Sequence, residues 1–286
     1  MSYCSDQYDL GDCIEYEFKF KGEYGTKGEK RGERRKATPE EIQRNNQRTK
    51  EKKLRRTIHL NFHEDDLWMT LKYPKGSRVT IGKVKKDVCG KWSGFLATMR
   101  RKYRLRGVPF KFIYRIEIGH MGGVHIHIIM NRIEGVDTAL LAKKTWADIS
   151  GGSANFEHLY SAGGFEGLAK YIAKPAESDD GQLTMFGVEG KKAFTKISSS
   201  RNLIRPEDVR TEKKYSHWTM RRLILEGPKP HPGYYIDRDS IVTGINPFTG
   251  YSYFYYTERK LKKERRKRGN TKAYQYLCPF GRAGRS

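Results

Sequence analysis

Apolar and polar positions between residues 67 and 160 follow two different spacings, which predict strands and helices in a regular order. Apolar residues alternate through 67–73, and β-forming residues dominate 110–118 and 124–130, so each segment predicts a strand. A long helix is predicted by apolar residues that recur every three or four positions, namely Val84, Val88, Trp92, Phe95, Met99 and Tyr103. A shorter helix at about 137–148 and a weak strand near 154–160 complete the series.

The resulting order, β-α-β-β-α-β, predicts an α+β fold with a ferredoxin-like, split βαβ antiparallel sheet. The strands at 110–118 and 124–130 are then joined by a turn at Gly119–Gly123 and lie in the middle of the sheet. A further helix is predicted over 163–174, because Pro175 disfavours helical backbone in the residue before it. Its expected buried side carries Phe165, Leu168 and Ile172.

The segments flanking this core are strongly basic. They divide the chain into a basic N-terminal arm (1–56), a nicking domain (57–175) and a C-terminal accessory region with a basic tail (176–286). In the arm, Thr38 precedes Pro39 and Glu41 as in a capped helix start. The arm therefore either forms a helix on contact with the core or DNA, or remains a solvated tail. No fold is assigned to the accessory region.

The net charge of the chain is +24, which favours nucleic acid as the partner, since a cationic surface attracts polyanions and releases their counterions. Acidic membranes are the weaker alternative, because no basic stretch has a regular apolar face and no run of 18 apolar residues exists. The start of the chain lacks the features of a secretory signal. Four scattered cysteines, without any C-x-x-C pair, argue against zinc or disulfides, so a cytoplasmic location is expected.

His125 and His127 are the first candidates for chemistry. Side chains at i and i+2 of a strand share a face, so both imidazoles can reach one cation. Glu117, eight residues before His125 across the predicted turn, is expected to face the same side. Two imidazoles and one carboxylate leave coordination positions open, as catalytic metal sites do. An accidental pair of surface or core histidines would give the same pattern.

Tyr171 and Lys174 are the second candidates. If both belong to the helix, three positions apart, the phenol and the ammonium are neighbours on one face. A nearby cation favours the phenolate, a stronger nucleophile than the phenol, and can hold a phosphate oxygen. Taken alone, this spacing is common, and a half-buried helical tyrosine is its usual explanation.

Together these motifs resemble the HUH endonuclease superfamily. His125-Ile126-His127 matches the His-hydrophobe-His motif, Tyr171-x-x-Lys174 the single-tyrosine nucleophile motif, and Glu117 the third ligand on the preceding strand. The strand at 67–73, with its threonine, stands where the Rep branch has its first motif. More narrowly, the chain resembles rolling-circle replication-associated proteins of small bacterial plasmids and phages. Two-tyrosine initiators carry both nucleophiles on one helix, whereas here Tyr160 falls before it, which points to the single-tyrosine branch.

The resemblance implies a metal-dependent DNA endonuclease and strand transferase. Glu117, His125 and His127 would hold Mn²⁺ or Mg²⁺, and Tyr171 would attack single-stranded origin DNA to give a 5′-phosphotyrosine, with Lys174 steadying the phosphate or phenolate. The arm and the basic run at 259–268 would contact phosphates. Trp68, Tyr73 or the tyrosines of 251–256 would either stack on bases or pack in the core. No phosphate-binding loop of the G-x-x-x-x-G-K-[ST] type occurs, so a host helicase is expected beside a host polymerase.

Two other function classes fit parts of the pattern. A non-catalytic nucleic-acid-binding module with a split βαβ sheet would look similar, but the aromatic motif of RNA-recognition domains is missing from the sequence. A transposase of the HUH group shares the order of the histidines and the tyrosine. A mobilisation relaxase fits less well, since its three-histidine cluster and N-terminal tyrosine are not seen.

Overall fold

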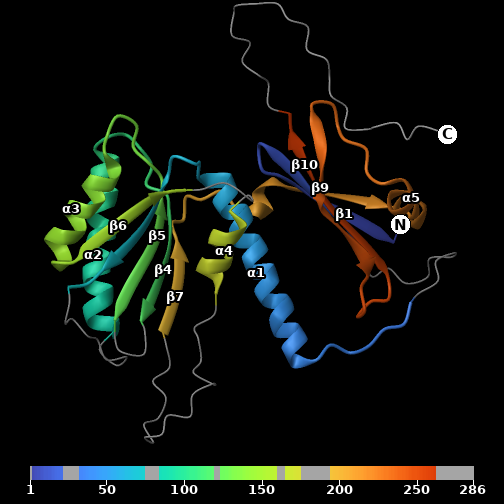
Figure 1. Cartoon of the computed structure of the whole chain (residues 1–286), viewed down its shortest axis with the longest axis horizontal. Helices are drawn as coiled ribbons and strands as arrows, with labels where there is room; N and C mark the ends of the chain where they lie inside the picture. The colour runs from blue at the N-terminus through green and yellow to red at the C-terminus, as the bar shows by residue number, and fades with distance from the viewer. Residues whose placement is uncertain are drawn as a thin grey trace, which may run out of the picture.

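The chain is folded around two antiparallel sheets. The computed structural model describes residues 2–21, 32–74, 84–118, 123–159, 165–174 and 194–261, and in these it has two five-stranded antiparallel sheets and five α-helices. Figure 1 shows one sheet in each of two lobes, with helix α1 (Pro39–Asn61) between them. The predicted α+β class is confirmed. The turn at 119–122, Tyr160, and the basic tail beyond residue 261 lie outside the described residues.

The first sheet contains all the strands that the sequence predicted between 67 and 160. Its strand order is β6 (Ser153–His158), β3 (Leu67–Lys72), β5 (Val124–Met130), β4 (Phe112–Ile118), β7 (Phe194–Ser199). β5 lies between β3 and β4, and α2 (Val84–Arg104) connects those two strands. The edge strand β7 comes from the C-terminal region, for which no fold was assigned.

Helices cover both faces of this sheet. On one face, α2 and α3 (Thr138–Ser150) bury a core in which Met69, Phe95 and Trp146 are fully enclosed. On the other face, α1 and α4 (Glu166–Ala173) pack Ile58 and Ile172 against the sheet. Each fully buried aliphatic or aromatic side chain contributes roughly 1.5–3 kcal/mol. Both faces are therefore held by apolar packing, which fixes the position of α4.

Helix α1 begins where the sequence places it. The side chain of Thr38 accepts a hydrogen bond from the backbone N–H of Glu41, and the carboxylate of Glu41 accepts one from the backbone N–H of Thr38. This capping box satisfies two N–H groups that the first turn leaves unpaired. The helix runs to Asn61 and therefore crosses the boundary drawn at residue 56.

The second sheet joins the two ends of the chain. Its order is β8 (Arg210–Tyr215), β1 (Tyr3–Asp9), β2 (Cys13–Phe20), β10 (Ser252–Lys260), β9 (Tyr234–Ile245). Its core holds buried Tyr3, Phe18 and Phe254, and Met220 of α5 (His217–Glu226). Residues 3–20 thus belong to a folded sheet, in contrast to the arm that their flanking charge suggested. Periodicity missed this because the pairing of β2 with β10 is more than 200 residues long in sequence.

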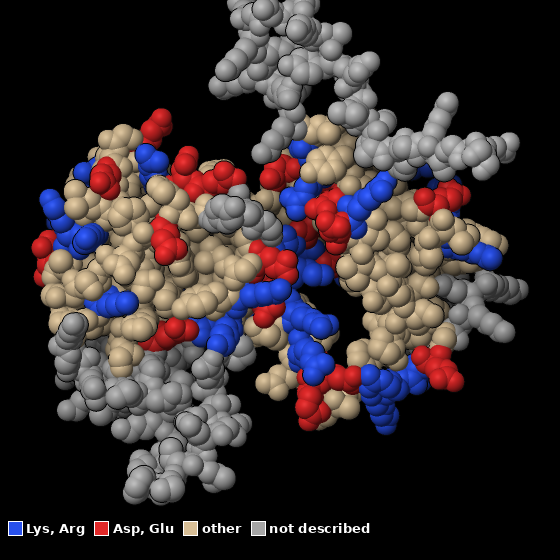
Figure 2. Space-filling view, in the orientation of Figure 1, with Lys and Arg blue, Asp and Glu red and all other residues tan. Residues whose placement is uncertain are grey.

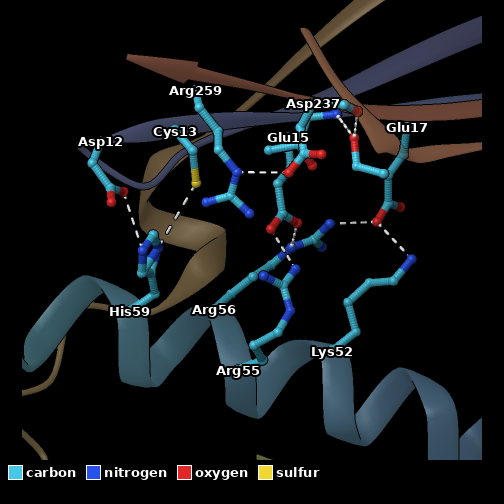
Figure 3. A network of polar contacts seen from close by, with 12 residues as sticks. Asp12, Cys13, Glu15, Glu17, Lys52, Arg55, Arg56, His59, Asp237 and Arg259 are labelled. Carbon is cyan, nitrogen blue, oxygen red and sulfur yellow. Dashed lines mark hydrogen bonds and ion pairs between the residues drawn. The ribbon is translucent and has the colours of Figure 1, made fainter. Parts of the chain in front are cut away.

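A buried ionic network ties the second sheet to α1 (Figure 3). Arg56, 5% exposed, donates from Nε to Glu15 at 2.8 Å and pairs through its other end with Glu17. Arg55 also pairs with Glu15, and Lys52 with Glu17 at 3.0 Å. These three cations of the predicted arm therefore hold the two lobes together, and phosphate contacts, if the arm makes them, fall to its other cations.

A cleft of about 730 Å³ lies beside this network, between α1 and the second sheet. Figure 2 shows a hollow between the lobes, with Lys and Arg side chains gathered on its α1 side. The cations Arg48, Lys52 and Arg55 line the cleft together with the acids Glu51 and Glu17. Its charge is thus mixed, unlike the net charge of the chain.

Acid is expected to loosen this joint between the lobes. Burial favours the protonated form of Glu17, but Arg56 and Lys52 outweigh burial and lower its pKa from 4.5 to about 2. A carboxyl whose folded-state pKa is lowered stabilises the fold above its unfolded pKa and loses that effect as pH falls from about 4.5 to about 2. Urea midpoints at pH 6, 4 and 3 should fall in that order. A midpoint unchanged between pH 6 and 3 contradicts the prediction.

Two sequence inferences about environment can be compared with the described part. Among its helices, none combines the length and the apolar composition needed to cross a bilayer. Cys4 and Cys13 are buried free thiols. The side chains of Cys89 and Cys278 are not among those described.

Candidate functional site

The first sheet places Glu117, His125 and His127 on one face, at the same end of two neighbouring strands. Glu117 of β4 lies directly opposite His125 of β5, and His127 lies opposite Arg115. Carboxylate Oε2 of Glu117 is 3.4 Å from Nε2 of His127. His125 is exposed, and its ring centroid lies 6.3 Å from that of His127. The face and the register are those expected from strand alternation.

His127 is held in one orientation by the neighbouring strand. Its Nδ1 lies 3.1 Å from the hydroxyl of Thr70 on β3, which is its direct partner in the strand pairing. The ring stacks on Trp68, with centroids 5.5 Å apart and planes 12° apart. A proton on Nδ1, donated to Thr70, leaves the lone pair of Nε2 directed at Glu117 and at the hydroxyl described next. Thr70 was visible in the sequence only as a threonine in an apolar strand.

Tyr171 brings a phenol to the same nitrogen. Its hydroxyl oxygen is 3.0 Å from Nε2 of His127, and the two rings meet edge to face at 5.1 Å. The side chain of Tyr171 is 42% exposed, whereas Ala169 and Ile172 on the other side of α4 are buried. The short helix thus buries one side in the core and presents its tyrosine at the histidine.

Lys174 does not occupy the helical position that the sequence suggested. Helix α4 ends at Ala173, and Lys174 is its C-cap with ψ 131°, well outside the helical range. The cause is Pro175, which pushes the residue before it towards extended backbone. The i, i+3 geometry assumed for Tyr171 and Lys174 is therefore wrong. The helix also starts later than predicted, at Glu166, after Phe165 with a left-handed φ of 64°.

Arg115 is a site residue that the sequence reading missed. It is 2% exposed, pairs with the carboxylate of Glu117, and donates to the backbone carbonyls of Ile172 at 2.9 Å and Tyr171 at 3.2 Å. It also donates to the carbonyl of Lys174. A guanidinium suits these partners because it presents several donors in a fixed fork and a charge at the negative end of a helix. An arginine facing the same side as Glu117 in an apolar strand was the available signal.

The local charges favour a carboxylate at Glu117 and a neutral phenol at Tyr171. The hydrogen bond to His127, aided by Arg115, lowers the pKa of Glu117 to about 2 despite its partial burial. Burial and the charge of Glu117 raise the pKa of Tyr171, against a smaller opposite effect of Arg115. Burial, Lys72 and His127 lower the pKa of His125. A charged carboxylate and a neutral imidazole are the forms that bind metal ions.

These residues fit a divalent cation in part. Glu117 Oε2 and His127 Nε2 are close enough to share an ion, and the bond from Nδ1 to Thr70 is of the kind that orients metal-binding histidines. His125 shares the face but does not bring a ligand atom within 4.8 Å of both others, so its exposed ring must rotate to join them. Carboxylate and imidazole ligands suit Mn²⁺.

A second group of potential ligands lies at the joint between the lobes. Ligand atoms of Asp12, Cys13 and His59 lie within 4.8 Å of one another, the one such triad in the described ranges (Figure 3). Nδ1 of His59 faces the Cys13 thiol at 3.9 Å, while Nε2 faces Asp12 at 3.1 Å. Burial, then Asp12 and Glu15, raises the pKa of Cys13 to about 12, so the thiol stays protonated. Opposite ring nitrogens and a neutral thiol are a hydrogen-bonded contact between the lobes, not an arrangement around one ion.

The residues from Asp66 to Ala176 have a family likeness. They match the family model of the replication-associated protein ORF2. The match spans less than half of the chain, and it supports a replication-associated role. No curated protein and no solved structure matches the chain.

The ORF2-like region, residues 66–176, contains the whole candidate site. It includes β3 to β6 and α2 to α4, and with them Thr70, Arg115, Glu117, His127 and Tyr171. The second sheet and nearly all of α1 lie outside it. The family likeness and the cluster of polar side chains therefore coincide in the first lobe.

Proposed function

We propose that this protein is a single-tyrosine HUH endonuclease that nicks and rejoins single-stranded DNA at an origin and so starts rolling-circle replication. The observation that carries the proposal is the 3.0 Å contact between the Tyr171 hydroxyl and Nε2 of His127, beside Glu117. The match to the ORF2 replication-associated family supports the replication role over transposition. The strand order β6-β3-β5-β4 supports a ferredoxin-like, split βαβ description of the domain.

In the proposed reaction, the phenol oxygen of Tyr171 attacks the scissile phosphorus in line with the 3′ oxygen. The bond from phosphorus to the 3′ oxygen breaks, leaving a 5′-phosphotyrosine and a 3′-hydroxyl; the proton lost by the phenol is balanced by the one that this oxygen gains. The reverse attack by a 3′-hydroxyl reseals the strand without ATP. Such chemistry requires an unpaired strand, opened by a host helicase and extended by a host polymerase.

Glu117, His127 and a rotated His125 would hold the cation, Mn²⁺ or Mg²⁺. When bound, this ion supplies positive charge to the phosphate oxygens. Nε2 of His127 can accept the phenol proton or hold a cation, and not both at once. Thr70 keeps that nitrogen directed at the site, and Arg115 holds the helix end that carries Tyr171. Lys174, just beyond that end, is proposed to contact the phosphate.

Arg115→Lys is expected to slow adduct formation about 100-fold, since a misplacement of about 1 Å of a reacting group has that effect. An ammonium cannot reach Glu117 and three carbonyls together, so Tyr171 should be less well positioned while DNA affinity stays within about twofold. Single-turnover rates with labelled DNA measure the first quantity, and titrations in EDTA the second. Partial rescue of Arg115→Ala by added guanidinium would separate positioning from misfolding, and equal rates for Arg115→Lys and wild type would contradict the role.

The proposal is tested by trapping the covalent intermediate. The full chain is incubated with a labelled single-stranded oligonucleotide from its own origin, with Mn²⁺ or with EDTA, and denatured. An adduct that survives denaturation, requires the cation and maps to the peptide carrying Tyr171 is expected. Binding without any adduct would leave the chain a non-catalytic nucleic-acid-binding module. An adduct on a peptide from another part of the chain would overturn the assignment of Tyr171.

A further inference from the structure

A second cavity opens beside the Tyr171 hydroxyl, on the side away from Glu117. It measures about 520 Å³ and is enclosed by β3, the end of β6 and the first turns of α4. That volume is within the ~300–1,000 Å³ common for small-molecule sites. Since His127 and Tyr171 form part of its wall, whatever occupies it lies next to the reacting atoms of the proposed nick.

The walls of this cavity are aromatic and apolar. Trp68 is partly exposed; it stacks on His127 and meets the ring of Tyr171 edge-on at 6.0 Å. Phe165 and Leu168 form the wall contributed by α4. A planar, partly exposed indole facing apolar side chains suits a flat ring, because an aromatic face stacks on any nucleobase.

The charge of the lining excludes a phosphate and favours a base. Among the described residues that line the cavity there is no lysine or arginine, and the one carboxylate is Glu157. Glu157 is exposed, and it lies directly opposite Trp68 in the pairing of β6 with β3. An anion would be repelled there, whereas an exocyclic amino group would find an acceptor.

We propose that this cavity binds one nucleobase of the single strand, that of a nucleotide flanking the scissile phosphate. The base stacks on Trp68, and Glu157 accepts from its exocyclic amino group, so cytosine or adenine is preferred to thymine. The location beside the scissile bond rests on the proposed function; base binding itself does not. The cavity then contributes to the choice of nick site, because the correct base anchors the strand beside Tyr171.

Homopolymers test this without knowledge of the origin, since every register presents the same base. Binding of (dC)12 and (dT)12 to the full chain is measured in EDTA, so that no cleavage occurs. Wild type should bind (dC)12 more tightly. Trp68→Leu, which keeps an apolar side chain but removes the stacking face, should weaken (dC)12 binding about 5- to 140-fold. The matched control is Trp218→Leu, on α5 in the other lobe, with an expected change of less than about twofold.

Glu157→Gln should reduce the preference for (dC)12 over (dT)12, while Glu226→Gln at the end of α5 should preserve it. Melting curves confirm that each variant is folded. Equal affinity of folded Trp68→Leu and wild type overturns the stacking role, and equal affinity of wild type for the two homopolymers overturns the base preference. Binding that depends on Trp68, without a covalent adduct, refutes the nicking proposal alone; an adduct without dependence on Trp68 refutes the base site alone.

Discussion

Replacing Tyr171 with phenylalanine is expected to reduce the covalent adduct at least about 10³-fold, to background, because the ring stays in place and the only atom lost is the proposed nucleophile. The variant also loses one hydrogen bond to His127, which stabilises a fold by about 1 kcal/mol at most positions. Its melting temperature and its affinity for single-stranded DNA should therefore stay close to wild type. Adduct yield on denaturing gels, measured beside binding titrations, gives both quantities.

Tyr235→Phe is the matched control for this prediction. That tyrosine is exposed to a similar degree, 46%, on β9 of the other lobe. It should form adduct at the wild-type rate. If Tyr171→Phe also formed adduct at that rate, the nucleophile would be another residue, and the contact with His127 would be a structural hydrogen bond only.

Replacing Arg56 with methionine is expected to destabilise the protein by roughly 3–5 kcal/mol, the usual loss when one member of a buried ionic cluster is removed. Glu15 and Glu17 would keep Arg55 and Lys52 as partners but lose the one cation that contacts both and is itself buried. The contact of the guanidinium with the Tyr8 ring, at 3.6 Å, is lost as well. Urea unfolding at pH 7 measures the change, with a fluorescence probe in each lobe to detect separate transitions.

Lys53→Met provides the comparison, on the same helix and three residues earlier. Lys53 pairs with Glu207 at 2.7 Å, but both side chains are more than half exposed. Solvent screens such a pair, so its loss should change stability by less than about 1 kcal/mol. Similar losses for Arg56→Met and Lys53→Met would show that the joint between the lobes does not depend on the buried network.

Local sequence determined much of the first lobe. The capped start of α1 could be read from Thr38 and Glu41, because a capping box involves only four consecutive residues. Helix α2 and strands β3 to β5 follow their apolar spacing, since one buried face imposes that spacing. The shared face of Glu117, His125 and His127 follows from the twofold repeat of a strand.

Tertiary structure alone decided what these elements bring together. No sequence rule places the Tyr171 hydroxyl at Nε2 of His127, 44 residues away, or lays Arg115 across the end of α4. Lys174 left the helix because of the next residue, a local effect that the spacing argument overlooked. The second sheet joins residues 3–20 to residues 210–260, and long-range pairing of this kind leaves no periodic signal in either segment alone. The sequence thus specified the elements and their faces, whereas packing between distant segments formed the site and the joint between the lobes.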